Sequence, residues 1–287
     1  MKHHFFLIIL FSFYIIAVTA LMIWQGIGIA PDRYMFVLLL GSLLIKRTRS
    51  FILDWLPFIF ILVSYDFLRG LAPFLNTHVN YQTLINTEIF IFGFIPTIFL
   101  QSQFLHLPNL NWYDYVATIF YFLHFAIPLG FGFLLWLDNK AYFKQFVVAI
   151  SLLSYSAWVT FVIFPASPPW LSSDKGYIPE VTKILDYTLG DFPTSYELPT
   201  LYHNMNPNPV AAMPSLHSAY PFLIFLFCLS FFKWKGLFFL PYILGVWISL
   251  VYLGEHYVID ILAGILYATT SFIATLILKT KIKWLNT

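Results

Sequence analysis

Long apolar stretches, separated by short polar connections, run along almost the whole chain. Most of them approach the ~20 residues that a helix needs to cross the hydrocarbon of a bilayer, where every backbone N–H and C=O must be satisfied within the segment. The pattern therefore predicts an all-α integral membrane protein with about eight transmembrane helices. The expected spans are residues 5–24, 34–45, 51–68, 113–136, 145–164, 214–232, 236–253 and 257–278.

One further apolar stretch, residues 85–100, is predicted to be an interfacial or re-entrant helix. If this stretch were a ninth span, it would reverse the membrane orientation of every later segment. The basic cluster at residues 279–283 would then lie outside the cell, against the preference of Lys and Arg for the cytoplasm. The alternative of a full span stays open at this point.

Basic residues set the expected orientation. With the N-terminus inside, eleven Lys and Arg residues face the cytoplasm and four face outside. Both ends of the chain are then cytoplasmic, and a proline-rich segment, residues 165–213, is external. The four outward-facing basic residues are Arg33, Arg69, Lys175 and Lys183.

Composition supports a membrane protein and excludes other classes. Only 10% of the 287 residues are charged and 60% are hydrophobic, with a mean hydropathy of +0.80, so a soluble domain is excluded. The net charge of +2 is spread over small clusters, and no nucleic-acid partner is expected. Cys228 is the single cysteine and lies in an expected span, which excludes an intrachain disulfide.

The chain is expected to have two parts. Residues 1–50 form N-terminal membrane anchor helices. Residues 18–20 resemble a signal cleavage site, but the apolar run continues through Trp24, which favours an uncleaved anchor; the cleaved alternative stays open. Residues 51–287 form a catalytic transmembrane domain, whose external loop 165–213 carries eight of the seventeen prolines and is expected to act as a lid.

Two histidines and a carboxylate are prominent, because ionisable groups are costly in apolar helices and are functional by default. Residues 214–217 read Pro-Ser-Leu-His, and His256 and Asp260 follow further on. Their spacing of four residues predicts that His256 and Asp260 share one helix face, where the carboxylate accepts the imidazole proton. His217, in the first turn of a helix that begins near Pro214, supplies a second proton carrier for chemistry on a phosphate ester.

These residues resemble the type-2 phosphatidic acid phosphatase superfamily, and in particular its inositol-phosphorylceramide synthase-like branch. The family's second motif, Pro-Ser-x-His, matches residues 214–217. Its third motif matches Ser249, His256 and Asp260 in spacing. The strings that are similar to the synthase branch are residues 164–170 and 252–260.

The resemblance implies a catalytic core of six helices and a covalent mechanism that uses neither a cofactor nor a metal. His256 is expected to attack phosphorus and form a phosphohistidine. Asp260 is expected to hold and charge the imidazole of His256, and His217 to protonate the departing oxygen.

The sequence departs from the phosphatase pattern in two places. Leu250 replaces the arginine of the third motif, and no stretch matches the first motif, a lysine followed after six residues by Arg-Pro. Because two phosphate-binding cations are missing, a simple phosphatase is less favoured. Arg69 is expected to neutralise phosphate or to pair structurally with Asp66, and Lys175 is a second candidate cation.

Three other polar residues are candidates for the same site. Ser215 is expected to cap the helix that follows it or to hydrogen-bond phosphate. Tyr121 and His124 lie one helical turn apart in the fourth expected span, where they can line the cavity. The alternative for His124 is a hydrogen bond to a backbone carbonyl.

Three functions are consistent with these observations. The leading hypothesis is a lipid phosphotransferase that moves a phosphoinositol-type headgroup from a phospholipid to a lipid alcohol such as ceramide, on the extracytoplasmic face. A lipid-phosphate phosphatase would use the same residues, with water as the acceptor. A transporter or membrane scaffold would use them as a proton relay. The expected partners are membrane lipids, and the oligomeric state is not predicted.

Overall fold

The computed structural model describes residues 47–191 and 208–286, with scattered positions between 9 and 43. Most of the expected N-terminal anchor, residues 1–50, lies outside this described part. What is described is helical, and apart from isolated bridges it contains no β-strand. The predicted all-α fold class is confirmed.

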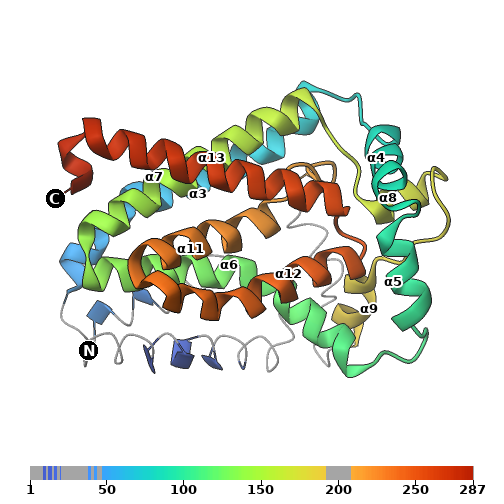
Figure 1. Ribbon diagram of the computed structural model, residues 1–287, viewed down its shortest axis with the longest axis horizontal. Helices are drawn as coiled ribbons and strands as arrows, with labels where there is room; N and C mark the ends of the chain where they lie inside the picture. Colours follow the sequence, from blue (N-terminus) through green and yellow to red (C-terminus); the bar gives the residue numbers. More distant parts are fainter. Residues whose placement is uncertain are drawn as a thin grey trace.

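Among the residues that the structure describes, five segments are long and apolar enough to cross a membrane, and one of them, Leu216–Tyr252, folds back on itself. Its two legs meet at the short 3-10 helix η1 (Lys233–Phe239), and Trp247 Nε1 of the second leg donates to Ser218 O of the first over 3.5 Å. Each span predicted after residue 50 coincides with one of the resulting helices, shown in Figure 1. They are α3 (Thr48–Leu75), α6 (Trp112–Asp138), α7 (Lys140–Ile163), α11 (Leu216–Phe232), α12 (Leu240–Tyr252) and α13 (Val258–Lys281).

The apolar stretch near residues 85–100 forms two short helices, α4 (Gln82–Phe92) and α5 (Pro96–Phe104), bent by 74°. The bend falls at Gly93, whose φ of +76° favours glycine, and Pro96 opens α5. The segment is therefore a broken span or a re-entrant loop and not one straight helix. Its interfacial position stays a prediction.

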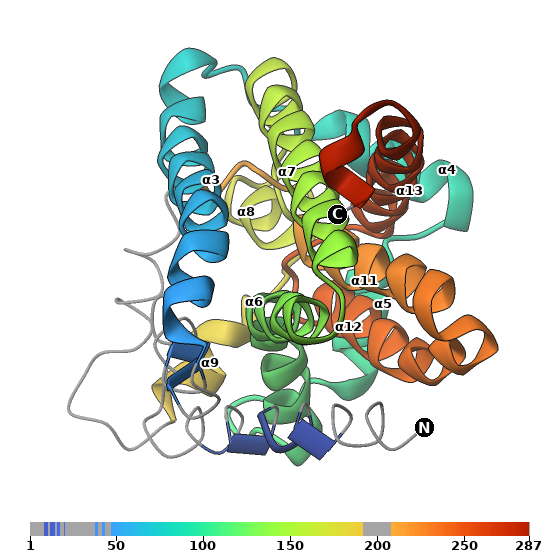
Figure 2. The same ribbon diagram turned by 90° about the vertical axis from the view of Figure 1, so that its left-hand side faces the viewer.

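Helix α6 forms the centre of the bundle. In its most apolar window 78% of the residues are buried, against 22–44% in the other four candidate spans. Gly132 lies where a side chain would meet Trp55 and Phe146, so these two fully buried rings pack directly against the α6 backbone. The outer helices surround α6 (Figure 2) and leave apolar side chains such as Phe60, 72% exposed, on their outer faces, as expected for contact with lipid.

Short helices gather at one end of the bundle. There α4 and α5 lie with α8 (Pro169–Asp174) and α9 (Ile184–Gly190), both from the segment predicted as an external loop (Figure 1). The segment is tied down by backbone hydrogen bonds, including Trp170 N to Gly254 O at 3.1 Å. A short 3-10 helix, η2 (Lys283–Asn286), follows α13. The division into an anchor and a catalytic domain, and the lid function, stay predictions.

Candidate active site

The two motif histidines lie side by side, although 39 residues separate them. Nδ1 of His217 is 3.0 Å from Nε2 of His256, a hydrogen-bond distance, so one of the two nitrogens carries the shared proton. His217 lies in the first turn of α11, and His256 lies in the connection between α12 and α13. Two proton carriers therefore meet at one point.

Close packing of α11 against α13 brings the motifs together. Ser215 N donates to Asp260 O over 3.0 Å, so the backbone of one motif is bonded to that of the other. A Cβ on Gly264 would lie 2.3 Å from Ser218 Oγ and 2.5 Å from Ser215 O. Only glycine fits between the two helices at this point.

His256 and Asp260 do not share a helix face, so the prediction drawn from their spacing is wrong. Helix α13 begins at Val258, and His256 precedes the N-cap residue, Tyr257. Gly254, with φ of +81°, turns the chain, and His256 N donates to Leu250 O over 3.2 Å. The imidazole therefore approaches the carboxylate from beyond the end of the helix.

Asp260 nevertheless lies next to His256. Its Oδ2 accepts from Tyr257 N over 2.9 Å, which caps α13, and lies 3.4 Å from Nδ1 of His256. The second separation is an ion-pair distance and not a formed hydrogen bond. Asp260 is fully buried and His256 nearly so, which keeps water away from the pair. The arrangement can orient the imidazole and stabilise its charged form.

Tyr121 and His124 from α6 both contact His217. The Tyr121 ring stacks on the His217 ring with centroids 4.6 Å apart, and the His124 ring lies edge-on at 4.0 Å. Nδ1 of His124 also contacts the carbonyl of Tyr121. Because that carbonyl can only accept, Nδ1 carries the proton in this contact. The carbonyl alternative for His124 is thus visible, and a role in lining a substrate cavity stays a prediction.

Comparison with known proteins identifies the family. Residues 83–274 match the PAP2 superfamily. The chain belongs to this superfamily.

The chain is therefore an enzyme of the phosphatidic acid phosphatase type 2 class, and the resemblance inferred from its motifs is confirmed. It is similar to a phosphoinositol dihydroceramide synthase of Bacteroides thetaiotaomicron, with 27% identity over 228 residues, covering 76% of this chain and 74% of the relative. No solved structure matches it significantly.

Of the two cations expected in this PAP2 site, Arg69 acts on His217 and His124 through its charge, without a hydrogen bond to either ring. Phosphate binding by Lys175 or by Arg69 stays a prediction. Arg69 donates to Asp66 over 3.0 Å, and its buried Nε has no hydrogen-bond partner among the described residues. Lys175 is exposed after the end of α8.

A second cation, Lys183, lies near the site and was not predicted there from the sequence. The Lys183 side chain is only 7% exposed, and its Nζ lies 4.4 Å above the Trp170 ring and 3.8 Å from Asp186. Its charge acts on Glu255, the neighbour of His256 in the chain. Burial raises the pKa of Glu255 to about 7, although the charge of Lys183 opposes the shift. Only the packing of residues 165–191 reveals this cluster.

Two residues of the bent pair α4–α5 hold the catalytic helices in place. Glu88, fully buried, accepts from Ile259 N over 3.0 Å and so caps α13 from 171 residues away. Gln101 donates to Tyr252 O over 2.9 Å at the end of α12, and exchanges hydrogen bonds with the backbone of Thr182. No sequence signal connects either residue to its partner.

Ser215 is the N-cap of α11, where its Oγ accepts from Ser218 N over 3.3 Å. Capping is thus visible, and a bond to phosphate stays a prediction. Within residues 47–191 and 208–286, no cluster of three or more His, Cys, Asp or Glu side chains is arranged to hold a metal ion. The predicted absence of a metal also stays a prediction.

Proposed function

We propose that this PAP2 enzyme is a lipid phosphotransferase that moves a phosphate-bearing headgroup from a phospholipid to a lipid alcohol. The observation that carries the proposal is the contact between His217 Nδ1 and His256 Nε2 at 3.0 Å, with the buried Asp260 carboxylate behind His256. The name of the relative supports a phosphoinositol headgroup and dihydroceramide, or a similar sphingolipid base, as the acceptor.

The first half of the reaction forms a phosphohistidine. Nε2 of His256 attacks phosphorus, the bond from phosphorus to the diglyceride oxygen breaks, and His217 gives that oxygen its proton. Asp260 holds the Nδ1 proton of His256 and balances the charge on the ring. A positioned proton donor contributes roughly 10²–10⁴ in rate.

The second half reverses these roles. His217, now neutral, takes the proton of the acceptor hydroxyl, the acceptor oxygen attacks phosphorus, and the P–N bond to His256 breaks. Both halves require the phosphoryl group to lie between the two imidazoles, so His217 and His256 separate from their 3.0 Å contact when substrate binds. Tyr121 and His124, packed against His217, define the wall on that side.

The charges near the site favour a phosphodiester substrate. A headgroup in diester linkage carries one negative charge, which Arg69 can neutralise with its planar set of donors. A terminal phosphate carries up to two negative charges. The cations that would neutralise them in a phosphatase are absent, because Leu250 replaces the arginine of the third motif and no stretch matches the first motif. The site is proposed to open to the extracytoplasmic side, on the basis of the eleven-to-four split of basic residues.

A phosphatase is the competing function, because water can attack the same intermediate. Purified enzyme in vesicles with phosphatidylinositol should release little diglyceride until ceramide or dihydroceramide is added, as measured by lipid mass spectrometry. Adding the acceptor should then yield phosphoinositol ceramide and diglyceride in equal amounts. Rapid phosphate release from lipid phosphomonoesters, unaffected by the acceptor, would reject the transferase and support the phosphatase.

A further inference from the structure

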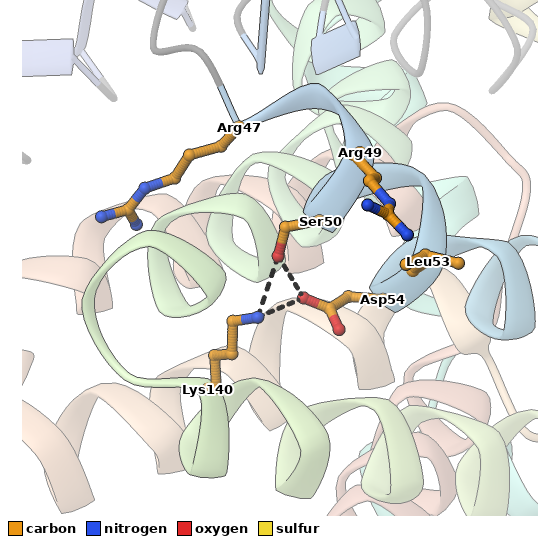
Figure 3. A pocket seen from close by; sticks show the side chains of 6 residues that line it. All are labelled: Arg47, Arg49, Ser50, Leu53, Asp54 and Lys140. Carbon is orange, nitrogen blue, oxygen red and sulfur yellow. Dashed lines mark hydrogen bonds and ion pairs between the residues drawn. The ribbon is translucent and has the colours of Figure 1, made fainter.

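An open pocket of about 490 Å³ is drawn in Figure 3, and it lies at the end of the bundle opposite the start of α13, as Figure 1 shows. It is formed by the start of α3 and the turn between α6 and α7. Arg49 and Arg69 are 20 residues apart along α3, which corresponds to about 30 Å at 1.5 Å per residue. This length equals the hydrocarbon thickness of a bilayer, so the two ends of α3 are far enough apart to lie at opposite membrane surfaces. The lining residues are Arg47, Arg49, Ser50, Leu53, Asp54 and Lys140.

The single carboxylate in the pocket is already neutralised. Asp54 Oδ2 lies 2.7 Å from Lys140 Nζ and also accepts from Trp136 Nε1 over 2.7 Å and from Ser50 Oγ over 3.1 Å. Figure 3 shows the Lys140–Asp54–Ser50 network near the centre of the view. These bonds fix the floor of the pocket.

The two arginines carry the remaining charge. The side chains of Arg47 and Arg49 are exposed, and no hydrogen bond or ion pair joins their guanidinium groups to a residue that the structure describes. Since Lys140 and Asp54 cancel, the pocket has a net charge of about +2. Two guanidinium groups, with planar sets of donors, suit the oxygens of a phosphate.

The surroundings favour a lipid over a free anion. Beside the pocket, α3 presents an apolar face, on which Leu53 is 64%, Leu56 60% and Phe60 72% exposed. A phospholipid whose phosphate lies at Arg47 and Arg49 can place its acyl chains along this face. A basic site at the cytoplasmic end of membrane helices attracts anionic headgroups, with each Lys or Arg contributing measurably.

We infer that this pocket binds the phosphate of an anionic phospholipid in the leaflet opposite the active site. The inference is independent of the proposed reaction, because none of the pocket residues contacts the histidines. Binding there would anchor the start of α3, the helix whose far end carries Arg69.

The test uses purified full-length protein in detergent and counts bound phosphatidylglycerol and phosphatidylcholine by native mass spectrometry. The double variant Arg47→Gln/Arg49→Gln should weaken phosphatidylglycerol binding about 30-fold, the effect of two basic residues. Lys235→Gln/Lys281→Gln is the matched control. It removes the same charge from exposed positions at the same end of the bundle and should change affinity less than twofold. His256→Ala should bind as the wild type does.

Each other outcome overturns the inference. Equal losses of phosphatidylglycerol affinity in the two double variants would show that the lipid is attracted to the basic surface in general. An unchanged affinity in Arg47→Gln/Arg49→Gln would show that the pocket is not the site. If millimolar inorganic phosphate displaces bound phosphatidylglycerol as effectively as added lipid does, the pocket is a site for free anions. If the double variant does not fold, Arg49→Gln alone gives the same comparison against Lys235→Gln.

Discussion

Glu88 is the most informative residue to perturb, because it caps the catalytic helix from outside both motifs. Its Oε1 accepts from Ile259 N, in the first turn of α13, over 3.0 Å. Asp260 lies in the same turn. We expect Glu88→Ala to free that turn, and Glu88→Gln to keep it in place because an amide oxygen can still accept.

The expected magnitude follows from the lost hydrogen bond. A hydrogen bond contributes about 0.5–1.5 kcal/mol, or about 1.5–3 kcal/mol where the acceptor is charged, and loss of an N-cap costs about 1 kcal/mol. Glu88→Ala should therefore lower the free energy of unfolding by about 2 kcal/mol, which corresponds to a fall in Tm of roughly 5 °C. A misplacement of about 1 Å at a reacting group costs up to ~10² in rate, so kcat should fall between tenfold and a hundredfold.

The assay follows lipid transfer in vesicles by mass spectrometry, with thermal unfolding measured in parallel. Glu88→Gln should keep kcat within about threefold of the wild type, and KM should change little in either variant, because Glu88 touches α13 and not the bound lipid. Glu180→Ala, which removes an exposed carboxylate, is the control. Full activity in Glu88→Ala, or equal losses in the alanine and glutamine variants, would refute the positioning role.

Other perturbations address the chemistry, the packing and the topology. His217→Ala and His256→Ala should each lower turnover by at least ~10²–10⁴ with little change in Tm; retention of a tenth of the activity in either would contradict the proposed roles. Gly264→Ala places a Cβ 2.3 Å from Ser218 Oγ, so unfolding should be easier by about 1–3 kcal/mol and transfer at least tenfold slower; wild-type values would disprove the close contact. Asp174→Cys, exposed in the external segment, should react with an impermeant thiol reagent in intact cells if the native cysteine is first replaced; reaction only after permeabilisation would reverse the topology. The phosphorylated intermediate should be acid-labile and alkali-stable and should form in EDTA, whereas a strict need for a divalent cation would indicate metal-assisted hydrolysis.

The helices after residue 50 could be predicted from the sequence because an apolar run of sufficient length has few alternatives in a bilayer. The break at Gly93 and Pro96 was also marked by residue types that punctuate helices. The sequence does not indicate the direction in which α5 continues after the break, because this direction depends on the hydrogen bonds of Gln101 to Tyr252 O and to Thr182. Local signals thus locate an element, and distant contacts orient it.

The candidate catalytic residues could be found from the sequence for a different reason. An uncompensated His or Asp in an apolar helix is costly, so its presence requires a function. The same reasoning does not predict that Lys183 is buried near the site, because a lysine in a polar loop is ordinarily exposed. Its burial against Trp170 arises only when the external segment packs on the end of the bundle.

The error over His256 and Asp260 shows what spacing alone leaves undetermined. Two residues four positions apart can lie on one face of the same helix. They can equally lie close together when one precedes a helix and the other is in its first turn. In this protein the second arrangement lets Asp260 cap α13 through Tyr257 N while it faces His256, and Ser215 bonds to the Asp260 carbonyl. The start of α13 is thereby held by its own carboxylate, by the neighbouring motif and by Glu88 of α4. Rigid support of this kind is what an acid–base pair needs, because catalysis depends on keeping the reacting groups within a fraction of an ångström of their working positions.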